Sequence, residues 1–210
     1  MAKLRSGILG QVRGKVAGVV GGQWKDVNYV REFVKPANPN TAAQQTQRGK
    51  FGDCVAFAKP LVGPIFNVYT DIFFKGMSGF NAFIKSNIQH FTAVPDLPSV
   101  KVTEGKLYMG VVTITAASAA GNQVDFTWGV ATGNNGADDD KIFAVAYNTM
   151  TGATAFMAAE DERDQGAVGS SISIGISVAD LIHVFLFAIK KSGTVVTMVS
   201  DSHHDSMVGA

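Results

Sequence analysis

Charged side chains, cysteine and long apolar runs are all scarce in this sequence. Of its 210 residues only 17% are charged, against about 25% in an average globular domain. The single cysteine, Cys54, excludes an intramolecular disulfide and a metal site built from several cysteines. The best apolar run, Leu181 to Ile189, has the length of a strand and falls short of a membrane span. Few charges beside abundant Gly, Ala and Phe indicate that part of the surface meets protein instead of water.

Motifs for nucleotide binding, catalysis and secretion are missing as well. Gly14-Lys15 fails as a phosphate-binding P-loop, because Leu9 stands where the first glycine belongs and Val16 where Ser or Thr belongs. No nucleophile elbow and no dinucleotide-binding glycine loop occurs. Arg13 and Lys15 interrupt what would be the apolar part of a signal peptide. The sequence therefore predicts a protein that is not an enzyme, needs no cofactor, and resides in the cytoplasm or in a virion.

The charges that are present lie unevenly along the chain. Residues 1–100 carry 12 basic and 5 acidic side chains, a net charge of +7, whereas residues 101–210 carry 6 and 12, a net charge of −6. A basic end of this kind can seek phosphate or an acidic partner. Alternatively, the basic half of one copy faces the acidic half of the next, head to tail. A third reading is two solvated surfaces that merely differ in charge.

The first 35 residues are typical of a glycine-rich β arm. Val and Ile favour strands, and the glycines among them permit bends and close approach of the backbone. An arm of this length buries little by itself, so it needs cover from another element or pairing with a neighbouring subunit. Basic residues interleaved with aromatic ones are also able to hold phosphate and stack bases. The candidate interaction residues are Arg13, Lys15, Trp24, Lys25, Tyr29, Arg31 and Arg48.

A helical layer is expected after the break around Pro36 and Pro39. Thr41 and Gln44 fit a capping box that begins a helix ending near Ala58. Two further amphipathic segments follow, from Pro64 to Phe73 and from Phe80 to Phe91. The prolines between Val94 and Ser99 indicate a domain boundary. We therefore predict two domains, residues 1–98 with the arm and helices, and residues 99–210.

From residue 107 onward the apolar pattern alternates with period two, which predicts strands. Turn residues separate the segments, and seven short strands in about a hundred residues are typical of an immunoglobulin-like or fibronectin type III sandwich. The predicted fold class is therefore α+β, with a seven-stranded antiparallel sandwich after the helices. His183 stands where fibronectin type III domains usually place a tyrosine, and Tyr108, Trp128 and Tyr147 are expected in the core. The predicted strands are Leu107–Ala116, Gln123–Ala131, Lys141–Asn148, Thr154–Ala159, Ser171–Ser177, Ile182–Lys190 and Thr194–Ser200.

Two polar clusters were considered as metal sites. Asp201, His203, His204 and Asp205 include suitable ligand types, but adjacent residues of a strand point to opposite faces. A polar tail, or an ion shared between subunits, explains this cluster better. The aspartates of residues 138–140 lack the alternating spacing of a calcium loop and are expected in a solvated turn. Residues 160–164 are expected in an exposed loop, and Cys54 is expected to pack in the core. No metal site is predicted.

The segment from Asn38 to Arg48 carries a resemblance to known proteins. It reads Asn-Pro-x-Thr-x-x-Gln-x-x-Gln-Arg, follows the glycine-rich arm, and is accompanied by Ser200-Asp201-Ser202 near the end of the chain. In these features the sequence resembles an uncharacterised family of Bacteroidota proteins. The resemblance implies an architecture and brings no catalytic residues. The same box is similar to segments of phage-type structural proteins, which implies a role in a virion.

Three hypotheses about function follow. The first is a homo-oligomeric structural component of a phage head, a phage tail or a phage-like particle, which associates with itself or with other virion proteins. The second is a binding module whose sandwich recognises a carbohydrate or a host protein. The third is nucleic-acid binding through the basic N-terminal half, which would weaken steeply with salt.

Overall fold

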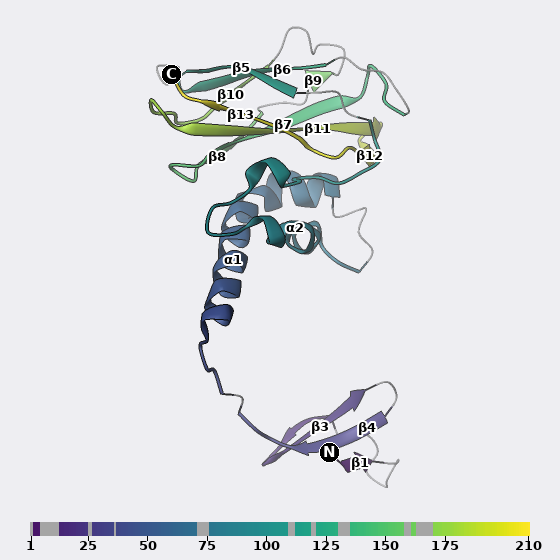
Figure 1. The fold of residues 1–210 in the computed structure, drawn as a ribbon. Helices are drawn as coiled ribbons and strands as arrows, with labels where there is room; N and C mark the ends of the chain where they lie inside the picture. Colours follow the sequence, from purple (N-terminus) through teal and green to yellow (C-terminus); the bar gives the residue numbers. More distant parts are fainter. Residues whose placement is uncertain are drawn as a thin grey trace. The chain divides into compact units, whose positions relative to one another are not determined.

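The computed structural model describes residues 2–4, 13–24, 27–35, 37–70, 76–108, 112–118, 121–129, 135–157, 161–162 and 170–210 (Figure 1). Helices and antiparallel sheets are both present, which confirms the α+β class. The chain divides into two compact units, Met1–Ala42 and Ala43–Ala210, called here the N-terminal and the C-terminal unit. In the described part of the chain, no helix has both the length and the hydropathy needed to cross a bilayer.

The N-terminal unit is a four-stranded antiparallel sheet with the strand order β1-β4-β3-β2. Glycines punctuate it as the sequence suggested, and Gly14 has a φ of +93°, a conformation that costs glycine little. Among residues 13–24, 27–35 and 37–42, Gly21 is the only one that is buried. The unit therefore has hardly any core of its own. Its strands are β1 (Ala2–Leu4), β2 (Gly14–Val16), β3 (Val19–Trp24) and β4 (Val27–Glu32).

The C-terminal unit begins with the predicted helical layer. The long helix ends where expected, and the second segment is a π-helix that reaches Thr70, beyond which residues 71–75 lie outside the described part. Ser78 caps the next helix, since its hydroxyl accepts a hydrogen bond from the Asn81 amide. The helices are α1 (Ala42–Ala58), η1 (Lys59–Leu61), η2 (Val62–Thr70), α2 (Gly79–Asn87), η4 (Ile88–His90) and η5 (Leu97–Ser99).

Two antiparallel sheets complete the C-terminal unit, one of three strands (β10-β6-β5) and one of six (β12-β11-β7-β8, with β13 on β11 and β9 on β7). The strands are β5 (Val112–Ser118), β6 (Gln123–Trp128), β7 (Lys141–Asn148), β8 (Thr154–Phe156), β9 (Asp161–Glu162), β10 (Ser170–Ser173), β11 (Leu181–Ser192), β12 (Val195–Val199) and β13 (His203–Val208).

Every predicted strand overlaps one of these, and that at residues 141–148 coincides with β7. Two strands were not predicted. The expected polar tail is wrong in part, because His203–Val208 is strand β13, paired with β11 over residues 181–186. Within the expected loop, Asp161–Glu162 pairs with β7 as β9, while residues 158–160 and 163–169 lie outside the described part.

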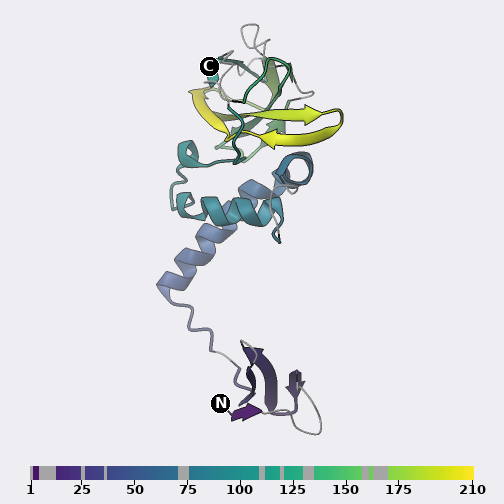
Figure 2. The same cartoon turned by 90° about the vertical axis from the view of Figure 1, so that its right-hand side faces the viewer.

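The larger sheet is covered on both faces, which explains why residues 182–189 of β11 are all buried. Figure 1 shows the three-stranded sheet over one face and the helices against the other, and Figure 2 shows the helices in the same place. On the helical face, Phe185 and Phe187 of β11 contact Phe57 and Tyr69 with ring centroids 5.8 and 5.7 Å apart. By the alternation of a strand, the even-numbered residues of β11 face the three-stranded sheet.

This packing explains why the chain divides near residue 42, whereas the prolines suggested residue 98. The helices share one core with the sheets, so they belong to the same unit. Trp128 lies in that core, as expected, at 4% exposure, and Tyr147 packs against Phe57. The core assignment of Tyr108 is wrong, because its side chain is 38% exposed.

Candidate functional site

One face of the N-terminal sheet gathers most of the candidate interaction residues. Directly paired residues of an antiparallel sheet share a face, and so do alternate residues of one strand. Lys15 pairs with Val20, and Val20 with Arg31, while Trp24 and Tyr29 are alternate neighbours of these positions on β3 and β4. We call the face that carries Lys15, Trp24, Val27, Tyr29, Arg31 and Phe33 the basic-aromatic face.

Contacts among these side chains hold the face in place. The Lys15 ammonium lies over the Phe33 ring, 3.7 Å from its centroid, a cation–π geometry. The Tyr29 ring lies across Gly22, where any added Cβ would come within 2.8 Å of ring carbon Cζ. Trp24 remains 69% exposed and Phe33 44% exposed. The arrangement presents aromatic surface beside positive charge.

The remaining candidates of the set lie elsewhere. Arg13 precedes β2, and its guanidinium donates a hydrogen bond of 2.6 Å to the Gln23 side chain. Lys25 lies outside the described residues. Arg48 lies in α1, which belongs to the C-terminal unit. Phe33 and Val27 were missed as candidates, although alternation from Tyr29 and Arg31 places both on this face.

The opposite face of the N-terminal sheet is also open. Val16 is 62% exposed and Val19 is 40% exposed. A soluble sheet normally covers one face with an apolar core. Among the described residues of the N-terminal unit, none covers either face of this sheet with an apolar core.

The polar cluster near the end of the sequence, Asp201, His203, His204 and Asp205, makes contacts within the fold. Within the described residues, no group of three or more potential ligands converges. His203 and His204 point to opposite faces of β13, because they pair with Leu186 and Phe185. The Asp205 carboxylate accepts a hydrogen bond of 2.7 Å from the Ile114 amide and thereby joins β13 to β5.

Ser200-Asp201-Ser202 clasps the segment 101–105. The Asp201 carboxylate accepts from the Lys101 ammonium at 2.7 Å and from the Gly105 amide at 2.9 Å. Ser202 accepts from the Val102 amide, and the Thr103 hydroxyl donates to the Ser200 carbonyl. Partial burial opposes ionisation of Asp201, but the hydrogen bonds from Lys101 and Gly105 outweigh it and lower its pKa.

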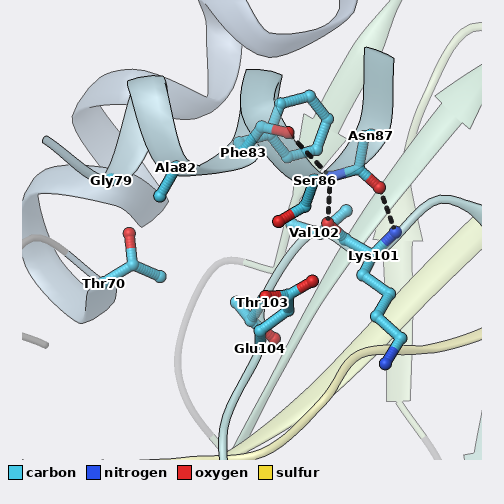
Figure 3. Close-up of a pocket in the computed structure, with 10 residues that line it drawn as sticks. All are labelled: Thr70, Gly79, Ala82, Phe83, Ser86, Asn87, Lys101, Val102, Thr103 and Glu104. Carbon is cyan, nitrogen blue, oxygen red and sulfur yellow. Dashed lines mark hydrogen bonds between the residues drawn. The ribbon is translucent and has the colours of Figure 1, made fainter. Parts of the chain in front are cut away.

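Figure 3 shows a small hollow beside this clasp. The Asn87 amide donates to the carbonyls of Phe83 and Lys101, and its oxygen accepts from the Lys101 amide at 2.8 Å. The hollow holds about 10 Å³, room for at most one water molecule. Asn87 therefore ties α2 to the strand-leading segment, and the hollow is no ligand site.

Buried His183 and half-buried His204 form a pair on the helical face of the large sheet. Nδ1 of His183 lies 2.7 Å from Nε2 of His204, so one ring donates a proton and the other accepts it. Burial, followed by repulsion from His204, lowers the pKa of His183 to about 4. Burial also lowers the pKa of His204, against the opposing influence of Asp205 and Asp96. Both rings are neutral at pH 7.

A groove of about 670 Å³ opens next to this pair. It lies between the end of α1, the segment 91–98 and the ends of β7, β11 and β13. Burial and the negative charge of Asp53 raise the pKa of Tyr147, which places that carboxylate near the phenol. No sequence motif marks the groove, because its residues come from distant parts of the chain. Its lining includes Asp53, Phe57, Phe91, Pro95, Tyr147, Leu181, His183 and Ser206.

Cys54 is buried as expected, with no exposed surface. Burial raises its pKa to about 11. The thiol is therefore protonated and a poor nucleophile at neutral pH. Its role is packing in the helical layer.

No curated protein and no solved structure gives a significant match. Residues 11–201 match a family of unknown function, DUF6266. The match assigns no activity, source organism or particle, so those expectations stay predictions. Because it spans most of both units, the chain belongs to the family DUF6266.

Proposed function

We propose that the protein is a non-enzymatic, homo-oligomeric structural component, of a virion or a phage-like particle, and that its N-terminal sheet is the surface of assembly. One observation carries the proposal: both faces of this sheet are open and hold large apolar side chains, among them Trp24 at 69% exposure and Val16 at 62%. Apolar surface of this extent on a small unit marks a contact with protein.

Energetics supports a partner for this sheet. Ordering the backbone costs roughly 1–2 kcal/mol per residue, and burial of apolar surface must offset it. A sheet gains that burial from a packed face, but Gly21 is the only buried residue among those of the unit whose burial is described. Cover by a partner would supply the missing burial.

Helix α1 offers a second unpacked surface. From Ala42 to Asp53 none of its residues is buried, and Phe51 is 50% exposed. Isolated helices of this length are marginal in water. The Asn-Pro-x-Thr-x-x-Gln-x-x-Gln-Arg box begins this stretch, so the box belongs to the proposed assembly region.

The charge balance favours a second copy as the partner. The N-terminal unit carries 7 basic and 2 acidic residues, a net charge of +5. The C-terminal unit carries 11 and 15, a net charge of −4. Opposite charges on two units of one chain suit head-to-tail association, which builds rings or filaments.

We also propose that the C-terminal sheets are a fibronectin type III-like sandwich. The first, second and fifth of the predicted strands form one sheet (β5, β6, β10), and the third, fourth, sixth and seventh form the other (β7, β8, β11, β12). This division supports the assignment. Strand β13 is an addition to the seven.

The proposal is tested by measuring molar mass against concentration for the full chain. We expect a rise in mass that Trp24→Ala weakens. Val178→Ala removes an apolar side chain that is 75% exposed on a turn of the other unit, and serves as the matched control. A protein that stays monomeric at high concentration, and is absent from purified particles, contradicts the proposal.

The basic-aromatic face favours nucleic-acid binding as a second candidate function. Lys15 and Arg31 lie on the same face as exposed Trp24, a combination that suits phosphates and stacked bases. A gel shift with single-stranded DNA or RNA tests it. Binding that falls steeply with salt and is lost in Trp24→Ala supports this function, and no binding at low salt excludes it.

A further inference from the structure

The groove beside the histidine pair has a one-sided charge. Among the described residues that line it, Asp53 is the only Asp or Glu, and none is a Lys or Arg. Asp96 lies between the lining residues Pro95 and Leu97. The groove is thus apolar, with acidic groups around it.

A polar atom in its lining lacks a partner. His183 is 4% exposed, and its Nε2 has no hydrogen-bond partner within the structure described. Its other ring nitrogen is occupied by His204. A buried nitrogen without a hydrogen bond is unfavourable, so an occupant with a polar group next to its apolar surface would gain by satisfying it.

The basic-aromatic face has the complementary properties. It presents Trp24 at 69% exposure, with Val27 directly opposite on the neighbouring strand. Lys15 and Arg31 supply positive charge on the same face. The Trp24 indole supplies apolar surface, and the Lys15 and Arg31 side chains supply N–H donors, which are the two properties that the groove calls for.

We propose that this groove receives the basic-aromatic face of the N-terminal sheet of a second copy of the chain. The inference rests on the proposed function and names the other half of its interface. Trp24 enters the apolar groove, and Arg31 or Lys15 pairs with Asp53. Since each copy has one N-terminal sheet and one such groove, the same contact repeats from copy to copy.

Charge reversal in the full-length protein tests the pairing. Asp53→Lys puts a positive charge at the groove, Arg31→Glu puts a negative charge on the sheet, and the double variant restores opposite charges. Asp139→Lys makes the same change in an exposed turn outside the groove lining and is the control. Sedimentation velocity gives the dissociation constant of self-association, and circular dichroism verifies that each variant is folded.

We expect each single reversal to raise the dissociation constant by about tenfold or more, the double variant to recover most of this loss, and Asp139→Lys to leave it unchanged. Asp53→Asn, which removes the charge without reversing it, has a smaller effect. An Asp53→Lys protein that associates normally while Arg31→Glu does not overturns the groove and leaves the proposed function standing. A wild-type protein that never associates contradicts both.

Discussion

At the scale of single residues, the most informative group is the neutral histidine pair under the helical layer. His183 and His204 are held uncharged by burial, at a distance of 2.7 Å between Nδ1 and Nε2. In the unfolded chain the same rings take up a proton near pH 6.5. The native state therefore binds fewer protons than the unfolded state below that pH, and its stability must fall with acidification.

His183→Asn tests this linkage. In the wild type, the contribution of His183 to the free energy of unfolding is constant above about pH 6.5 and declines from there toward pH 4, the range between the ordinary and the folded-state pKa of His183. Asn keeps a polar atom near the Nδ1 position but does not titrate, so the variant should be less stable at pH 7 and show a shallower decline. Urea unfolding at several pH values measures both. An unchanged slope in the variant contradicts the assignment.

Gly105 is a second residue whose role is set by geometry. A Cβ added here would lie 1.8 Å from the carbonyl oxygen of Val199, so the backbone has to move apart at the clasp formed with Ser200-Asp201-Ser202. We expect Gly105→Ala to lower the free energy of unfolding by roughly 2 kcal/mol or more. Gly175→Ala, at a site with no atom within 4 Å of the added carbon, is the comparison. Equal effects of the two substitutions in thermal melts would refute the close contact.

At the scale of elements, helix α1 contains two glycines that lower its stability, and no close packing by the described residues explains their presence. Gly49 and Gly52 lie in its exposed half, and neither would meet an atom within 4 Å if it carried a Cβ. Gly49→Ala should therefore stabilise the isolated chain by about 0.5–1 kcal/mol. Gly76→Ala, where φ is +78°, should destabilise it. Chemical unfolding of dilute protein gives both values, and a loss of stability in Gly49→Ala would contradict an unpacked helix.

The elements also separate what sequence patterns are able to predict from what they are not. Alternation of Val, Phe and Trp found β6 closely, and the capping pattern found α1, because those signals are local. Strand β13 was missed because its residues are polar. Its stability comes from pairing with β11 and from bonds such as that between Asp205 and the Ile114 amide. The groove was missed because it also depends on tertiary structure. Only the packing of α1 against the sheet brings Asp53 and His183 into the lining of one groove.

At the scale of the whole molecule, the division of the chain into two units also separates a net positive part from a net negative part. The prolines near residue 98 suggested a boundary, yet Phe57 packs against Tyr147 and Phe185 and joins the helices to the sheets. With the division at residue 42, the charge difference falls between a small sheet without a core and a unit with a large core. The small sheet is then the part that calls for a partner.

The central claim is that a second copy covers the N-terminal sheet, and hydrogen–deuterium exchange of the full chain over a wide range of concentration tests it most directly. If the claim is right, the amides of β3 and β4 (residues 19–24 and 27–32) become more protected as concentration and molar mass rise, while those of β7 and β11 stay equally protected throughout. Exchange in β3 and β4 that does not change with concentration, in samples whose mass shows that copies have associated, would contradict it.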